Sequence, residues 1–151
     1  MSILIESPVL GSLDVTQDDI YLFPSGIPGF EDQKRFIIVQ PEANAPFAYL
    51  QSMDHADLVL LVTDPFAFYP DYDFEVPEQV IGELEIEASE EVGTWAVVTV
   101  PQSMEAATMN LLAPILLNVR SRKGRQTILT NTSYSTKHPM FPFGQASGDN
   151  L

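Results

Sequence analysis

Short hydrophobic segments separated by turn residues dominate this chain, and they restrict it to a mostly β fold. The segments are rich in β-branched and aromatic residues, and they end at turn sequences such as Pro24-Ser25-Gly26 and Asp64-Pro65. Several such strands at short spacing favour a closed or nearly closed antiparallel sheet, either a barrel or a sandwich. We expect strands over residues 19–23, 35–40, 47–53, 58–63, 94–100, 110–119 and 126–130.

A single domain accommodates this pattern. A chain of 151 residues is long enough to bury a core without disulfides or metal. We predict a mostly β, antiparallel β-barrel-like fold over residues 1–141, with one or two short helices. Residues 142–151 have little to bury, and we expect them to form a flexible tail.

The helices and the best hairpin are predicted from local signals. Pro77 favours the start of a helix, and an apolar stripe follows at Val80, Ile81 and Leu84. A second helical turn is expected over residues 103–107. The strands at 110–119 and 126–130 are expected to form a hairpin, with Lys123-Gly124 in its turn. Pro114 then implies a bulge or an edge position.

Composition excludes several classes of function. The absence of cysteine removes disulfides, thiol nucleophiles and cysteine-based zinc sites. The longest apolar runs are far shorter than the roughly 18 residues of a membrane helix, and the first residues make a poor signal peptide. We therefore expect a soluble, cytoplasmic protein that does not bind membranes. A formal net charge of −14 argues against direct nucleic-acid binding and favours a basic protein surface as partner.

The charge is also unevenly distributed along the chain. No Lys or Arg lies between Arg35 and Arg120, and nearly all the positive charge that remains sits in the run 120–125. One interpretation is a solvated face and a separate basic turn, and the other is a dedicated acidic face. The densest acidic stretch holds Asp71, Asp73, Glu75, Glu78, Glu83, Glu85, Glu87, Glu90 and Glu91.

A search for catalytic or metal chemistry yields no candidate. His55 in Asp54-His55-Ala56-Asp57 invites a metal interpretation, but a turn between two strands explains it better. The calcium-loop pattern that begins at Asp71 lacks the Gly and Glu it needs at its sixth and twelfth positions. No G-x-S-x-G motif is present. We therefore predict no catalytic residue, no metal site, no cofactor and no enzyme activity.

The aromatic segment 64–74 is more informative. We expect Phe66, Phe68 and Phe74 to fill the core. Two tyrosines beside Pro and Asp are expected at a half-exposed surface, because partner sites combine aromatic side chains with charge. The predicted partner-binding rim comprises Tyr69, Asp71, Tyr72, Asp73 and Glu75, with Glu78, Glu83, Glu85 and Glu87 as field-setting acids.

Several motifs in order resemble the family of the flagellar assembly factor FliW. They are FPSGIPGFE at 23–31, TDPF at 63–66, PDY at 70–72, NLLAPI at 110–115 and YSTKHP at 134–139. The resemblance runs from about residue 3 to residue 141 and implies a β-barrel-like fold with short helices. In the first motif, the Gly and Pro residues are expected to build a fixed loop, because they dictate backbone geometry.

The resemblance also implies two protein partners. Proteins similar to FliW bind CsrA, a small RNA-binding translational repressor, and they bind flagellin in a mutually exclusive switch. With flagellin bound, CsrA is free to repress flagellin mRNA, and after flagellin export CsrA is captured and translation resumes. We hypothesise that the acidic body repels RNA electrostatically within about 8 Å, the Debye length at physiological salt. The alternatives are a generic acidic flagellin chaperone or adaptor without regulator binding, and a small enzyme of unknown chemistry.

Overall fold

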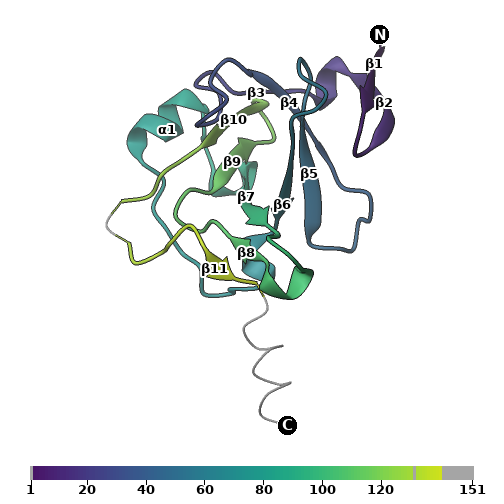
Figure 1. Cartoon of the computed structure of the whole chain (residues 1–151). Coiled ribbons are helices and arrows are strands. Elements are labelled where there is room, and N and C mark those ends of the chain that lie inside the picture. Colours follow the sequence, from purple (N-terminus) through teal and green to yellow (C-terminus); the bar gives the residue numbers. More distant parts are fainter. Residues whose placement is uncertain (1, 131, 141–151) are drawn as a thin grey trace.

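Paired strands form a ring in this protein, and smaller elements surround it (Figure 1). The structure is a computed structural model that describes residues 2–130 and 132–140. The predicted tail at 142–151 lies outside the described residues. The strands are β1 (Ser2–Ser7), β2 (Gly11–Thr16), β3 (Tyr21–Leu22), β4 (Arg35–Val39), β5 (Phe47–Ser52), β6 (Val59–Thr63), β7 (Val92–Thr99), β8 (Thr108–Met109), β9 (Ile115–Asn118), β10 (Lys123–Gln126) and β11 (His138–Pro139).

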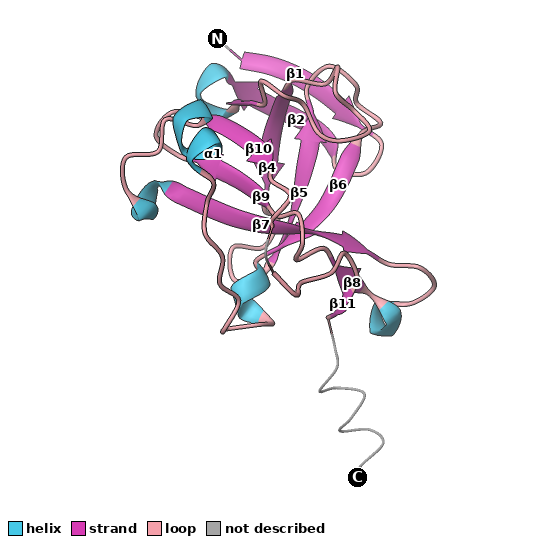
Figure 2. Cartoon of the chain, turned by 90° about the vertical axis from the view of Figure 1, so that its left-hand side faces the viewer, coloured by secondary structure: helices cyan, strands magenta, loops and turns pink. Residues whose placement is uncertain are grey.

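The ring closes through a second pairing of β7. The sheet runs in the order β7-β6-β5-β4-β3-β10-β9, and β9 pairs back to β7 at Trp95↔Ile115. This confirms the mostly β, barrel-like prediction. All of these pairings are antiparallel except β3 with β10, which pair in parallel at Lys123↔Leu22. β8 and β11 extend the far end of β7, as Figure 2 shows.

The core inside the ring comes from the inward-facing residues of neighbouring strands. Phe23 and Phe36 are fully buried, and their ring centroids lie 4.9 Å apart in an edge-to-face arrangement. Leu50, Val62 and Leu117 complete this cluster from β5, β6 and β9. Because successive side chains of a strand point to opposite faces, one face of each strand lies inside the ring.

The hairpin of β9 and β10 differs from the prediction. β9 occupies only the second half of the predicted strand 110–119, and its partner ends at Gln126 instead of beginning there. Asn110 starts a turn whose backbone N–H groups at Leu112 and Ala113 donate to its Oδ1. Gly124 lies within β10, where it pairs with Leu117 of β9, rather than in a turn. A Cβ atom there would meet the Phe23 ring at 2.7 Å. The glycine permits close packing.

Other local predictions divide into confirmed and wrong. The helix α1 (Glu78–Glu83) follows Pro77 as predicted. The helical turn predicted at 103–107 is a single 3-10 turn over Met104–Ala106. The hairpin of β1 and β2 was not predicted, and the expected strand at 19–23 is reduced to β3.

The loop at 23–31 adopts the fixed geometry expected of its glycines. Gly26 has φ +67°, and a Cβ atom there would lie 2.5 Å from the carbonyl oxygen of Glu31. Gly29 has φ +91°, another conformation that favours glycine. In the described residues, no helix is long and apolar enough to cross a membrane.

Candidate partner-binding site

The aromatic segment 64–74 leaves β6 and forms one wall of a surface groove. Its 3-10 turn η2 (Pro65–Ala67) follows Asp64, whose Oδ1 accepts from the backbone N–H of Phe66 at 3.0 Å. This turn buries Pro65 but leaves the Phe66 side chain 41% exposed. The prediction that Phe66 fills the core is therefore wrong.

Tyr72 occupies the buried position next to Phe66. Its side chain is only 5% exposed, and its hydroxyl donates to the carbonyl of Leu111 at 2.7 Å. Burial raises the pKa of this phenol above its ordinary value. The expectation of a half-exposed Tyr72 is wrong, because the hydroxyl finds a buried backbone acceptor that local sequence does not reveal.

Tyr69 is half-buried, as predicted. Its hydroxyl donates to the carbonyl of Pro139, and its ring meets the edge of His138 at a centroid distance of 5.5 Å. His138 accepts a hydrogen bond at Nε2 from the backbone N–H of Ser135. Burial lowers the pKa of His138 and raises that of Tyr69. These contacts hold β11 beside the aromatic segment.

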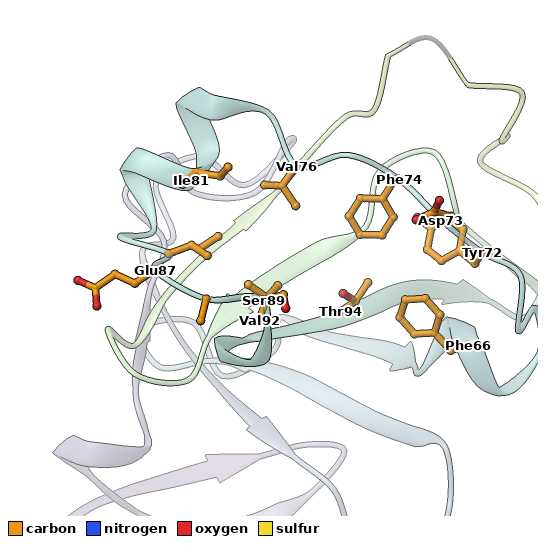
Figure 3. A pocket seen from close by; sticks show the side chains of 12 residues that line it. Phe66, Tyr72, Asp73, Phe74, Val76, Ile81, Glu87, Ser89, Val92 and Thr94 are labelled. Atoms are coloured by element: carbon orange, nitrogen blue, oxygen red, sulfur yellow. The ribbon is translucent and has the colours of Figure 1, made fainter.

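The groove itself lies between this segment, the region after α1 and the start of β7. It is a hollow of about 570 Å³ with mainly apolar walls. Figure 3 shows Ile81 and Val76 toward one end and Phe66 at the other, with Val92 and Thr94 along the floor. Ile81 is 38% exposed, so large apolar side chains face solvent at both ends. Such exposed apolar surface is typical of a protein-binding groove.

Of the predicted rim, Asp73 is the carboxylate that the structure brings to this groove. Asp73 is exposed and lines it, and Asp71 and Glu75 are exposed on the same segment. Glu75 lines a neighbouring hollow with Asp73 and Tyr134. Glu78 is exposed in the first turn of α1. In residues 2–130 and 132–140, none of these four carboxylates forms a salt bridge.

Four of the five acids that follow Glu78 in the 71–91 stretch form ion pairs, so they do not make up an open acidic face. The basic run covers the turn between β9 and β10 and the first residues of β10, and it lies against the end of α1. Three cations bind four acids: Arg125 pairs with Glu83, Lys123 with Glu85, and Arg120 with Glu87 and Glu91. The Lys123 hydrogen bond lowers the pKa of Glu85. The pKa of Glu91 is also lowered, chiefly by a hydrogen bond from the backbone N–H of Glu87 and next by one from the Arg120 side chain.

Hydrogen bonds to the end of α1 explain why the basic turn lies there. The last carbonyls of a helix lack partners within the helix. Here the carbonyl of Leu84 accepts from the side chains of Asn118 and Ser121 at 2.8 Å, and that of Glu85 accepts from Arg120. Cations beside a helix C-terminus also complement its dipole. We name these residues, 118–125 together with 83–91, the acid–base junction.

The acid–base junction changes the charge distribution inferred from the sequence. Nine acids between residues 71 and 91 stand against four cations between 120 and 125, which leaves −5 of the total −14 in these two segments. The remaining −9 is carried elsewhere on the chain. Glu83, Glu85 and Glu87 were predicted as field-setting acids, and their ion pairs reduce that field. Among the described carboxylates of this segment that form no salt bridge, Asp73 lines the groove.

Sequence reasoning missed the groove because its walls come from three separate elements. Phe66, Ile81 and Thr94 share no period that a local pattern could reveal. The acid–base junction did carry a signal, since the basic run and the acidic stretch have opposite charge.

His55 lies in the turn between β5 and β6 as expected, and its backbone N–H donates to Ser52 Oγ. Among the described residues, no three His, Asp or Glu side chains gather as metal ligands would.

Comparison with known proteins gives consistent matches over nearly the whole chain. Residues 4–140 match the model of a protein family described as FliW protein. A flagellar assembly factor FliW from Syntrophomonas wolfei is 42% identical over 142 residues, covering 94% of this chain and 91% of that protein. One from Desulfitobacterium hafniense is 43% identical over 144 residues, covering 95% of each. A crystal structure of the flagellar assembly factor FliW aligns with a TM-score of 0.86 at 36% identity, covering 93% of this chain and 99% of that one.

Proposed function

The chain belongs to the FliW family of flagellar assembly factors, and we propose that it acts in the cytoplasm as a protein-binding regulator of flagellin synthesis. In this proposal it binds the translational regulator CsrA and relieves the repression of flagellin mRNA. It also binds flagellin, and the two partners exclude each other. The role requires no catalytic step, no cofactor and no direct contact with nucleic acid or membrane.

The apolar groove is the observation that supports this location for the binding site. Phe66 and Ile81 expose large side chains at its two ends, and the carboxylate of Asp73 lies beside them. Exposed aromatic and aliphatic side chains supply affinity, and charges at the margin select the partner. This arrangement supports a partner segment with apolar side chains flanked by Lys or Arg.

A shared groove also gives a simple basis for mutual exclusion. If both partners insert apolar side chains between Phe66 and Ile81, one occupant blocks the other without any conformational change. The groove of about 570 Å³ has room for a few side chains and not for two segments at once. Competition then depends only on the concentrations and affinities of the two proteins.

Electrostatic antagonism of RNA remains part of the proposal in a modified form. The acid–base junction neutralises much of the 71–91 stretch, so the repulsive potential comes from the whole −14 body. A protein of this charge bound near an RNA site opposes phosphates within about one Debye length. The effect should weaken as salt is added.

A three-component binding experiment tests the proposal. The purified chain is titrated into a complex of CsrA with flagellin mRNA, with and without purified flagellin, and RNA release is followed. We expect RNA release that flagellin suppresses in proportion to its concentration. Flagellin binding without CsrA binding would support the chaperone alternative and contradict the switch. Absence of binding to either protein would contradict both.

A further inference from the structure

The β1–β2 hairpin lies outside the ring and has a free edge. β1 pairs with β2 over Ser2↔Thr16 to Ser7↔Gly11, and in the described residues β1 has no other strand partner. Figure 2 shows β1 as the outermost strand at the top of the molecule. An unpaired strand edge presents backbone donors and acceptors to any chain that can align with it.

The direction of the free backbone groups follows from the hairpin register. Thr16 donates its backbone N–H to Asp19 Oδ2 at 2.9 Å and not to Ser2. Because hydrogen-bonded and non-hydrogen-bonded pairs alternate in an antiparallel ladder, Leu4 and Glu6 also belong to the non-hydrogen-bonded set. The backbone N–H and C=O groups of Leu4 and Glu6 therefore point away from β2, toward the open edge.

Glu6 is the only charged residue of β1, and no Lys, Pro or bulge guards its edge. Natural edge strands are commonly guarded by Lys, Pro or a bulge, and the strand sequence SILIES has neither Lys nor Pro. Its register with β2 is continuous across all six pairs, without a bulge. A strand rich in Ile and Leu with an open edge is well suited to pairing with an extended segment of another protein.

The two faces of the hairpin are clearly different. Ile5 and Val15 are buried and pack with Ile37 of β4, which fixes the hairpin on the ring. On the opposite face Leu4 is 67% exposed. It lies directly across from Asp14 of β2, and Glu6 is the next residue of β1 on the same face. The outer face thus presents one large apolar side chain between two exposed carboxylates.

The charge around this edge is unbalanced, in contrast to the acid–base junction. The segment 1–33 holds six acids and no Lys or Arg. In the described residues, none of these six forms a salt bridge. Arg122 lines the same hollow as Asp14 and Asp19, but its guanidinium lies 3.8 Å over the Tyr21 ring and donates to the Tyr21 hydroxyl. The field at this end of the molecule is negative.

From the open edge, the exposed Leu4 and the unpaired carboxylates, we propose that β1 binds an extended basic segment of a partner protein by strand addition. The segment alternates Lys or Arg with apolar residues, so that its backbone pairs with Leu4 and Glu6 while its cations meet Glu6 and Asp14. This surface is separate from the apolar groove and does not depend on the function proposed above. A second copy of this chain is disfavoured, because it would bring the same carboxylates and another net charge of −14 to the interface.

A synthetic peptide tests this directly with the full chain. An eight-residue peptide that alternates Lys and Val is titrated into isotopically labelled protein, and amide shifts and hydrogen exchange are measured by NMR. We expect saturable binding, shifts concentrated in residues 2–7, and slower exchange of the Leu4 and Glu6 amides. A peptide with the same side chains but N-methylated at alternate positions should bind at least about tenfold more weakly, because it cannot form the ladder.

Matched variants distinguish binding at the β1 edge from general attraction to the negative net charge. Glu6→Lys combined with Asp14→Lys should weaken peptide binding on the order of tenfold or more. Glu42→Lys combined with Glu105→Lys makes the same change in net charge at exposed positions outside the hairpin, and should change binding less than about threefold. Equal loss in both double variants, equal binding of the N-methylated peptide, shifts centred on the groove, or dimers of the free chain through β1 would each overturn the proposal.

Discussion

The side-chain amide of Asn118 donates a 2.8 Å hydrogen bond to the carbonyl of Leu84, the C-cap residue that follows α1. Both residues are fully buried. The Oδ1 atom of Asn118 also accepts from the backbone N–H groups of Arg120 and Ser121. One side chain therefore fixes both the β9–β10 turn and the end of the helix, and this places the basic run against the acidic stretch.

Replacement of Asn118 by Ala should be strongly destabilising. The change leaves the buried carbonyl of Leu84 with one bond fewer and removes the acceptor for two turn amides. We expect the free energy of unfolding to fall by about 2–4 kcal/mol in urea denaturation. Asn44→Ala, at an exposed position in the turn before β5, is the control and should change it by less than about 0.5 kcal/mol. Equal effects would contradict the role assigned to Asn118.

The ion pairs should differ in strength according to their exposure. In the Glu83–Arg125 pair the side chains are 18% and 27% exposed, against 47% and 40% for Asp54 and Arg35. Double-mutant cycles to Ala should give a coupling energy of about 1 kcal/mol for the first pair and about 0.5 kcal/mol or less for the second. High salt should reduce both. A stronger coupling between Arg35 and Asp54 would contradict this ranking.

Two glycines in the 23–31 loop should respond differently to alanine. Both have positive φ, but an added Cβ meets the backbone of Glu31 at Gly26 and meets nothing within 4 Å at Gly29. Gly29→Ala should lower the free energy of unfolding by about 1–2 kcal/mol from the backbone conformation alone. Gly26→Ala should lower it by more than about 3 kcal/mol. Thermal and urea unfolding of the two variants measure this difference. Similar losses would show that the close approach at Gly26 does not matter.

Removal of the Tyr72 hydroxyl should affect both stability and its pH dependence. Tyr72→Phe deprives the carbonyl of Leu111 of its bond and should cost about 1–2 kcal/mol at pH 7. Because burial raises the folded pKa of Tyr72 above its value in the unfolded chain, stability should fall as pH rises above about 10. The variant should lose stability less steeply there. Tyr49→Phe, on β5, is the control for the loss at pH 7 and should cost less than about 0.5 kcal/mol.

Truncation of the groove should weaken partner binding more than folding. Phe66→Ala and Ile81→Ala remove the two exposed apolar side chains, and each should weaken binding to CsrA and to flagellin by about tenfold. Both residues are only partly exposed, at 41% and 38%, so the free energy of unfolding should also fall, by about 1 kcal/mol. Val100→Ala, equally exposed at the end of β7, is the matched control and should leave binding unchanged. Weakening for only one partner would contradict a shared site.

Much of the fold could be predicted because its signals are local. The strands β4, β5, β6 and β7 and the helix α1 combine a clear hydrophobic pattern with turn residues at their ends. The predictions failed where the identity of a residue is explained by a contact with a residue far away in the sequence. Gly124 resembles a turn glycine, but it lies in β10, and a glycine is needed there because Phe23 packs against it. Pattern and propensity cannot register a contact made a hundred residues away.

The sequence by itself determined the class of fold, the family and the excess of negative charge. Tertiary structure decided which charges remain available. It joined Arg120, Lys123 and Arg125 to the acids around α1, buried Tyr72 and exposed Phe66. In the described part of the chain it left the carboxylates of the β1–β2 hairpin without a salt bridge. The physical reason is that the effect of a charge or an aromatic ring depends on its neighbours in space, and closure of the ring brings together residues that are far apart in the chain.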